Sequence, residues 1–239
     1  MVIDANGSAG GAMALMNKIS AWRFINPPKA WSDSIVVNKH GKRMIDETVY
    51  GASLGEQIGD HNEGIGYIVY DKAARKAAFK QAMDPMIVPF QRDVTLLNLL
   101  FNFKKADTLE ALAGKVGIDK AGLVETVAHY NKAVKGEEAD PFGKQTTDMI
   151  PIAEPPFYAM DISIASRFLP MPVITFGGLT VDEQSGLVKD EKGEPIPGLY
   201  AAGRTAVGVA SNTYVSGLSF ADCVFSGRRV ARHAARANR

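Results

Sequence analysis

Residues 198–222 read GLYAAGRTAVGVASNTYVSGLSFAD, and this stretch decides the fold that the sequence predicts. It begins as a short apolar run typical of a buried strand and breaks at Gly203 into a loop of small residues. An apolar-periodic helix follows from near Ser216, and we expect it to continue to about Ala235. Because the first amides of a helix lack intrahelical partners and carry the positive end of its dipole, this arrangement predicts a site for an anionic or electron-rich ligand.

The composition is that of a globular chain of 239 residues, long enough for one large or two modest domains. The net charge is +1 and no basic stripe is interleaved with aromatic residues, so we expect no nucleic-acid partner. The single cysteine, Cys223, excludes a disulfide framework and fits a reducing, cytoplasmic location. Its place in an apolar helix predicts that it is buried. The four histidines lie in separate segments, so we expect no metal site.

The most apolar run, residues 94–103, is too short to span a bilayer. It predicts a buried or pocket-lining helix. The sequence therefore disfavours membrane contact, and a role at a membrane surface is the weaker alternative.

The first half of the chain has mainly helical signals. Apolar residues at helical spacing predict a helix over residues 12–22, which Asn26-Pro27-Pro28 ends. A turn at Gly41 predicts a hairpin of strands 34–38 and 43–45. A short helix is expected from about Ser53, and a strand at residues 65–70.

Three residues that can cap a helix precede apolar-periodic runs. They are Asp71, Thr108 and Asp119, and they predict helices over residues 72–83, 109–116 and 120–134. After a polar connection over residues 136–156, short runs predict strands at 157–164, 173–176, 179–182 and 186–189. Glycines between the last of these predict a β-meander, and the change near residue 150 marks an internal boundary.

Five spaced signatures carry information about the family. They read VNKHGKRMIDE (37–47), HYN (129–131) followed by Gly136 and DPFGK (140–144), PPFYA (155–159), TFGGLTVD (175–182) and IPGLYAAG (196–203). In this order they resemble the flavoprotein superfamily of fumarate reductase and succinate dehydrogenase. Within it the chain is most similar to 3-ketosteroid dehydrogenase-like proteins, and the resemblance implies FAD as the cofactor.

Two positions favour the steroid dehydrogenase branch over the fumarate reductases. The resemblance implies a histidine just before the Thr-x-Gly-Gly turn of fumarate reductases, and this chain has Ile174. It implies an arginine before the flavin helix, where this chain has Tyr214. Because a dicarboxylate needs fixed cations, a small apolar ketone is the expected substrate.

The superfamily begins with a strand, a G-x-G-x-x-G turn and a helix that hold the ADP part of FAD, and this chain has none of these. We expect an α+β protein that corresponds to the C-terminal part of such an enzyme, with a cap (substrate) domain and the C-terminal segment of a Rossmann-like FAD-binding domain. The predicted domains are residues 1–29, the end of the first FAD-domain segment, 30–150, the cap, and 151–239, the second FAD-domain segment. By itself the chain is expected to be incomplete and inactive, and a separate N-terminal FAD-binding half is a candidate partner.

The resemblance implies an FAD-dependent dehydrogenase acting on a CH–CH bond, in which a proton leaves the carbon next to a carbonyl and a hydride goes to flavin N5. Tyr214, with the amide of Gly217, is the candidate for polarising the ketone oxygen, and Tyr50 is the candidate base. The candidate flavin contacts are Ala202, Gly203, Arg204, Ser216, Gly217, Leu218 and Ser219. Two alternatives remain open at this point: a fumarate-reductase-like enoate reductase, and a non-catalytic remnant that lacks FAD.

Overall fold

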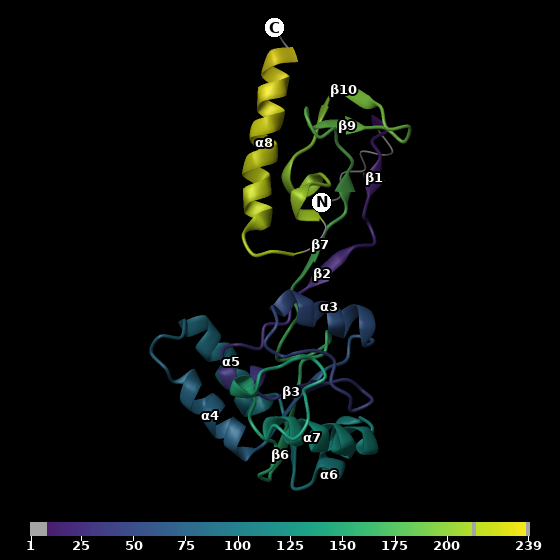
Figure 1. The fold of residues 1–239 in the computed structure, drawn as a ribbon. Coiled ribbons are helices and arrows are strands. Elements are labelled where there is room, and N and C mark those ends of the chain that lie inside the picture. Colours follow the sequence, from purple (N-terminus) through teal and green to yellow (C-terminus); the bar gives the residue numbers. More distant parts are fainter. Residues whose placement is uncertain (1–8, 212–213, 238–239) are drawn as a thin grey trace. The chain divides into compact units, whose positions relative to one another are not determined.

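The computed structural model describes residues 9–211 and 214–237 (Figure 1). Contacts divide the chain into two compact units. Unit 1 comprises residues 1–20 and 173–239, and unit 2 comprises residues 21–172. Unit 2 is therefore inserted between the two segments of unit 1. The predicted domain boundaries lie at different residues, 29/30 and 150/151. Residues 151–172 belong to unit 2 because they include a strand of its sheet.

Unit 2 is built on a four-stranded antiparallel sheet. Its strands, in spatial order, are β3 (Ile35–Val37), β4 (Tyr67–Tyr70), β6 (Phe157–Asp161) and β5 (Lys104–Ala106). The register pairs Val36 with Ile68 and Ile68 with Met160. Because every residue of β4 pairs with β6, the strand after residue 150 completes a sheet that begins before residue 40.

Helices cover both faces of this sheet, since successive strand residues point to opposite sides. Val36, Ile68 and Met160 enter a core with α2 (Lys29–Ser32), α3 (Gly51–His61), α4 (Lys72–Ala82) and α5 (Pro89–Phe101). Val37, Val69 and Ala159 enter a second core with α6 (Leu109–Val116) and α7 (Lys120–Val134). The sheet is thus the middle layer of three (Figure 1).

The three predicted helix caps of unit 2 are confirmed. The side chains of Asp71, Thr108 and Asp119 accept hydrogen bonds from the amides of Ala74, Ala111 and Gly122 at the starts of α4, α6 and α7. The predicted hairpin after β3 is shorter than expected, since its return strand is a single bridge between Val37 and Arg43. A short 3-10 helix, η1, covers Thr146–Asp148.

Unit 1 consists of short strand pairs and one long helix. β1 (Met13–Ala14) pairs with β8 (Gly178–Leu179), β2 (Ile19–Ala21) with β7 (Val173–Thr175), and β9 (Leu187–Lys189) with β10 (Pro195–Tyr200). The bridge from Val181 to Val188 joins the β8 and β9 segments, so the predicted β-meander is present. Two 3-10 helices, η2 (Gly203–Thr205) and η3 (Val209–Ser211), precede α8 (Leu218–Ala237).

Two predictions for unit 1 are wrong. Residues 12–22 form β1 and β2 in place of a helix, because their backbone groups pair with strands more than 150 residues away in sequence. Cys223 is exposed on α8, although its apolar surroundings predicted burial. The core of this unit is small, with Val188, Ala201 and Ala206 buried at its centre, and it leaves the apolar side chains near Cys223 uncovered.

Candidate functional site

Tyr50, the predicted base, lies in unit 2 immediately before α3. Its carbonyl accepts a hydrogen bond from the Ser53 amide at 2.9 Å, which fixes the backbone at the start of the helix. Its ring is 41% exposed and packs edge-on against Phe24, with ring centroids 5.6 Å apart. Tyr50 is therefore held by backbone and ring contacts and keeps an accessible side.

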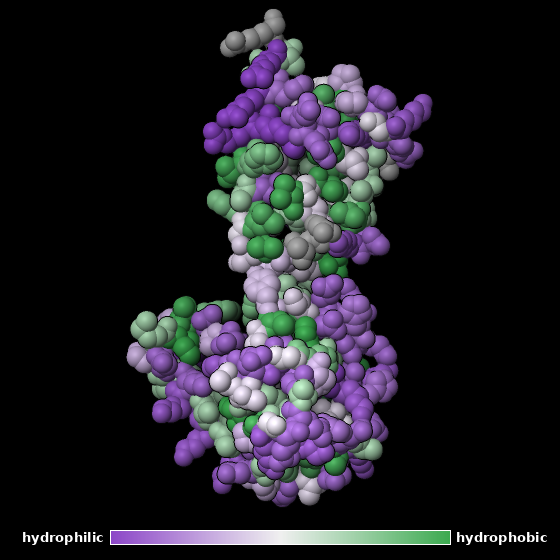
Figure 2. Space-filling model, viewed as in Figure 1, coloured by the Kyte–Doolittle hydropathy of each residue, from purple (hydrophilic) through white to green (hydrophobic). Residues whose placement is uncertain are grey.

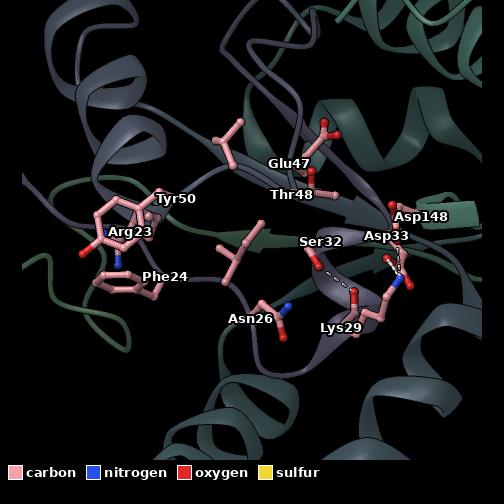
Figure 3. Close-up of a pocket in the computed structure, with 13 residues that line it drawn as sticks. Arg23, Phe24, Asn26, Lys29, Ser32, Asp33, Glu47, Thr48, Tyr50 and Asp148 are labelled. Carbon is pink, nitrogen blue, oxygen red and sulfur yellow. Dashed lines mark hydrogen bonds and ion pairs between the residues drawn. The ribbon is translucent and has the colours of Figure 1, made fainter. Parts of the chain in front are cut away.

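A cavity of about 320 Å³ opens beside Tyr50, within the range of about 300–1,000 Å³ that small-molecule sites occupy. One end is aromatic, with the rings of Tyr50 and Phe24 lying together (Figure 3). The other end is charged: Lys29 Nζ lies 2.6 Å from Asp33 Oδ1 and 3.0 Å from Asp148 Oδ1. Burial opposes the charge on Lys29, but these two hydrogen bonds raise its pKa above the usual value. The cavity can thus hold an elongated molecule with a polar group at its far end.

Arg23 lines the same cavity but is committed to the fold. Its guanidinium donates to Leu169 O at 2.6 Å and to Ser163 O at 2.7 Å, and the side chain is 2% exposed. Burial lowers its pKa to about 10, and the charge of Asp161 partly opposes this shift. Arg23 therefore ties the segment before α2 to the segment after β6.

A buried ionic cluster lies directly behind the Tyr50 loop. Glu47 accepts from Arg43 Nε and Nη2 at 3.0 and 2.8 Å, and from Lys144 Nζ at 2.9 Å. Arg43 also donates to Asp140, and its guanidinium lies 5.0 Å from the ring centroid of Phe142. These five residues belong to the signatures at 37–47 and 129–144. The two signatures therefore specify an ionic cluster that stabilises the fold. Sequence reasoning did not identify this role, because the two signatures are about 100 residues apart.

In unit 1, Gly203 packs against α8. Its amide donates to Ser226 Oγ at 2.8 Å, and that hydroxyl in turn donates to Asp222 O at 2.6 Å. Its φ is +59°, and a Cβ on Gly203 would lie 2.8 Å from Cys223 Sγ. The amide is thus used inside the protein, while the neighbouring Ala202 is only partly buried.

Arg204 is also held by the protein. Its guanidinium donates to the carbonyls of Ala210 and Thr175 and lies 5.4 Å from the ring centroid of Phe176. It therefore links η2 to η3 and to β7. A direct contact between Arg204 and a cofactor would compete with these bonds.

The start of α8 has the features expected for an electron-rich ligand. Val215, Ser216 and Gly217 are exposed. Gly217 has φ of +83°, and a Cβ there would meet no atom within 4 Å. Within the described residues, no hydrogen bond is found from the amides of Ser216, Gly217 or Ser219. Amides at a helix N-terminus beside open space fit the pyrimidine edge of a flavin, which gains negative charge on reduction. Leu218 opens the helix, its amide bonded to Val215 O at 3.0 Å.

Tyr214 precedes this helix start in unit 1 and is partly buried, whereas Tyr50 belongs to unit 2. Tyr214 is therefore close in sequence to Ser216, Gly217, Leu218 and Ser219. Residues 212 and 213, within the loop that sequence analysis singled out, lie outside the described residues.

Sequence reasoning missed Asp222 on α8. Its side chain is 5% exposed, and a Cβ on Gly208 would lie 3.1 Å from Asp222 Oδ2. Burial raises its pKa, and the charges of Arg229 and Arg204 partly oppose this. In the sequence, the one sign of this buried acid was an aspartate within a run of apolar residues at helical spacing.

Comparison with known proteins identifies the family. The model of the FAD binding domain family matches residues 32–219. The chain belongs to this family. FAD is the cofactor of the family, in agreement with the resemblance seen in the sequence.

The relatives include steroid dehydrogenases and fumarate reductases. The chain is 37% identical, over 82% of its length, to 3-oxo-5-alpha-steroid 4-dehydrogenase of Comamonas testosteroni, and covers 37% of that protein. It is 26% identical, over 98% of its length, to a fumarate reductase (cytochrome) of Shewanella frigidimarina, and covers 39% of it. The crystal structure of 3-ketosteroid-delta4-(5alpha)-dehydrogenase from Rhodococcus jostii RHA1, in complex with 4-androstene-3,17-dione, matches with a TM-score of 0.77 and 30% identity. That match covers 95% of this chain and 43% of the Rhodococcus chain. The chain thus spans less than half the length of each of these relatives.

Proposed function

We propose that the chain provides the substrate unit and the C-terminal flavin segment of an FAD-dependent enzyme that dehydrogenates a 3-oxosteroid or a similar apolar ketone. The observation that carries the proposal is the match, over 95% of the chain, to the Rhodococcus steroid dehydrogenase. In this proposal the cap domain of residues 30–150 holds the substrate. Residues 1–29 and 151–239 contribute to the FAD domain.

FAD, when bound, accepts a hydride at flavin N5. The start of α8 would hold the flavin ring through the amides of Ser216 and Ser219, beside Gly217. Ala202, Gly203, Arg204 and Leu218 would lie around it, with Arg204 acting mainly by fixing η2 and η3. The protein thus supplies positive potential where the reduced ring carries negative charge.

In the proposed reaction, Tyr214 polarises the ketone and Tyr50 is the base. The Tyr214 hydroxyl, with the Gly217 amide, donates to the ketone oxygen and makes the adjacent C–H acidic enough to lose its proton. Tyr50 receives that proton, and the second hydrogen leaves as hydride, so a carbon–carbon double bond forms. The aromatic end of the cavity, at Tyr50 and Phe24, suits the ring system of an apolar ketone.

The test is turnover of a 3-ketosteroid with an artificial electron acceptor. The chain is combined with the N-terminal FAD-binding half of a relative, which is the partner that the proposal requires. We expect Tyr214→Phe to lower turnover by at least about 100-fold and to leave the flavin absorbance unchanged. Tyr200→Phe is the matched control, since the Tyr200 hydroxyl bonds His233 Nδ1 at 3.0 Å in the same unit. Unchanged turnover in Tyr214→Phe would contradict the assignment.

An enoate reductase is the second candidate, favoured by the similarity to the Shewanella fumarate reductase. Ile174 and Tyr214 count against it, because they offer no charge to a dicarboxylate. Measuring turnover of fumarate against that of a 3-ketosteroid separates the two. A chain that shows no flavin absorbance band after mixing with FAD and the N-terminal half would support a third reading, a remnant without catalysis.

A further inference from the structure

Helix α5 buries two polar side chains and exposes several large apolar ones. Its buried side carries Thr95, Asn98 and Leu99, and Asn102, directly after the helix, is 6% exposed. Asn98 Nδ2 donates to Val94 O at 2.8 Å, and Asn102 Nδ2 donates to Asp161 O at 2.8 Å. A helix at the surface of a water-soluble domain normally turns its polar residues outward. The C-terminal half of α5 departs from this rule, because Leu97, Leu100 and Phe101 are exposed there.

The apolar face consists of the outer side chains of α5 and of the connection from α4, which are Met83, Met86, Val88, Phe90, Leu97, Leu100 and Phe101. Met86 is 88% exposed and Phe90 is 75% exposed. Figure 2 shows hydrophobic side chains gathered where Figure 1 places the α4–α5 connection. A cluster of this kind, as opposed to scattered single residues, marks an interaction surface.

Basic residues outnumber acidic ones in the segments that carry the apolar face. Residues 72–105 contain seven Lys or Arg and two Asp, while the net charge of the whole chain is only +1. The exposed cations are Lys72, Lys76, Lys80, Arg92, Lys104 and Lys105. Two copies of this surface placed face to face would repel each other. An apolar face in segments of net positive charge instead complements an anionic phospholipid surface.

A cavity of about 330 Å³ lies at the C-terminal end of α5. Phe101 and Phe168 stack there with ring centroids 6.5 Å apart. Lys104, Lys115 and Arg167 are also in the lining, together with Asp161, whose Oδ1 accepts from the Ser163 amide at 2.9 Å. Aromatic rings beside cations fit the acyl chain and the phosphate of one anionic lipid.

We infer that the apolar face of α4–α5 docks on an anionic phospholipid bilayer, with α5 in the plane of the headgroups and a lipid phosphate near Arg167. The inferred contact is peripheral. No helix in the described part of the chain is long and apolar enough to cross a membrane. The inference does not depend on the proposed catalytic function. The sequence disfavoured membrane contact because it predicted a buried or pocket-lining helix at residues 94–103. In the structure, Leu97, Leu100 and Phe101 of this run are exposed.

Co-sedimentation of the full chain with vesicles tests the inference. We expect binding to vesicles of phosphatidylcholine with phosphatidylglycerol, weaker binding to phosphatidylcholine alone, and loss of binding at high salt. Phe90→Ser/Leu100→Ser should weaken binding at least about tenfold, because it removes apolar contact with the acyl region. Lys104→Gln/Arg167→Gln should weaken binding to the anionic vesicles and reduce its salt dependence.

Phe220→Ser is the matched control, since Phe220 is 77% exposed on α8 of unit 1. It should bind vesicles like the wild type. Circular dichroism checks that each variant is folded. Three results would overturn the inference: no vesicle binding by the wild type, equal binding by Phe90→Ser/Leu100→Ser, or a wild-type dimer that this variant dissociates and that does not bind vesicles.

Discussion

Lys144 Nζ lies 2.9 Å from Glu47 Oε2, and both side chains are completely buried. The same ammonium donates to Ser32 O and Ser34 O, each at 2.7 Å, so all three of its donors are used. Burial lowers the pKa of Lys144, and the charge of Glu47 opposes that shift. The loop that carries Tyr50 is therefore fixed by an ion pair whose charges have no access to water.

Lys144→Met should be strongly destabilising. It leaves Glu47 buried with one cation fewer, and breaking a buried pair in this way costs about 3–5 kcal/mol. The measurement is the free energy of unfolding in urea. Lys132→Met is the control, because Lys132 pairs with Glu138 at 2.7 Å on the surface, and it should unfold like the wild type. Equal small effects of both variants would show that the buried pair does not brace the fold.

Two buried tyrosines of unit 2 should respond in opposite ways to loss of the hydroxyl. Tyr130 Oη donates to Asp33 O at 2.6 Å and accepts from the Ile150 amide at 3.2 Å. Tyr70 Oη is buried and makes no hydrogen bond of normal geometry among the described residues, and the nearby Arg75 opposes the rise of its pKa. Tyr130→Phe should lose about 1–3 kcal/mol, while Tyr70→Phe should keep or slightly increase stability. Urea unfolding of the two variants checks this, and a larger loss in Tyr70→Phe would contradict it.

Tyr70 also predicts a change in alkaline stability. Burial raises its pKa to about 12, whereas an unfolded tyrosine ionises near 10. Between these values the folded state keeps the proton and the unfolded state releases it. The contribution of Tyr70 is thus complete below about pH 10 and is lost as the pH rises towards 12. Between about pH 9 and pH 11 the wild type should lose more stability than Tyr70→Phe. Parallel losses would contradict the shift.

Gly203→Ala should destabilise unit 1 for two separable reasons. The positive φ of +59° costs about 1–2 kcal/mol for a residue with a Cβ, and the added Cβ would lie 2.8 Å from Cys223 Sγ. The double variant Gly203→Ala/Cys223→Ala should remove the clash and recover only that part of the lost stability. Gly217→Ala, at φ +83° in open space, should show the backbone cost alone. Thermal unfolding compares the three, and no recovery in the double variant would exclude the clash.

Local signals in the sequence predicted much of unit 2. The caps Asp71, Thr108 and Asp119 are side chains that bond amides three residues ahead, so their information is local. The strand at residues 65–70 and the strand after residue 156 were also found from short apolar runs. The pairing of these strands needed the structure.

The errors arise where distant segments decide the outcome. Met13, Ile19 and Trp22 have helical spacing, yet Met13 pairs with Leu179 in an antiparallel ladder. The signature residues Arg43 and Lys144 were useful as a fingerprint, but only the fold shows that both bind Glu47. For the candidate site, the start of α8 was predicted from its glycine and helix signals, whereas the cavity beside Tyr50 depends on the packing of three separate segments.

The insertion of unit 2 between the two segments of unit 1 sets an order of events during synthesis. Strand β1 leaves the ribosome long before its partner β8 exists, since the two are separated by all of unit 2. At about 5–20 residues per second, this delay is on the order of 10–30 s. Unit 2 contains every strand of its own sheet and ends at residue 172, just before β8, so it is complete before unit 1 is. The apolar residues of β1 and β2 must meanwhile stay unpaired, and they are where a nascent chain of this protein would most readily engage a chaperone.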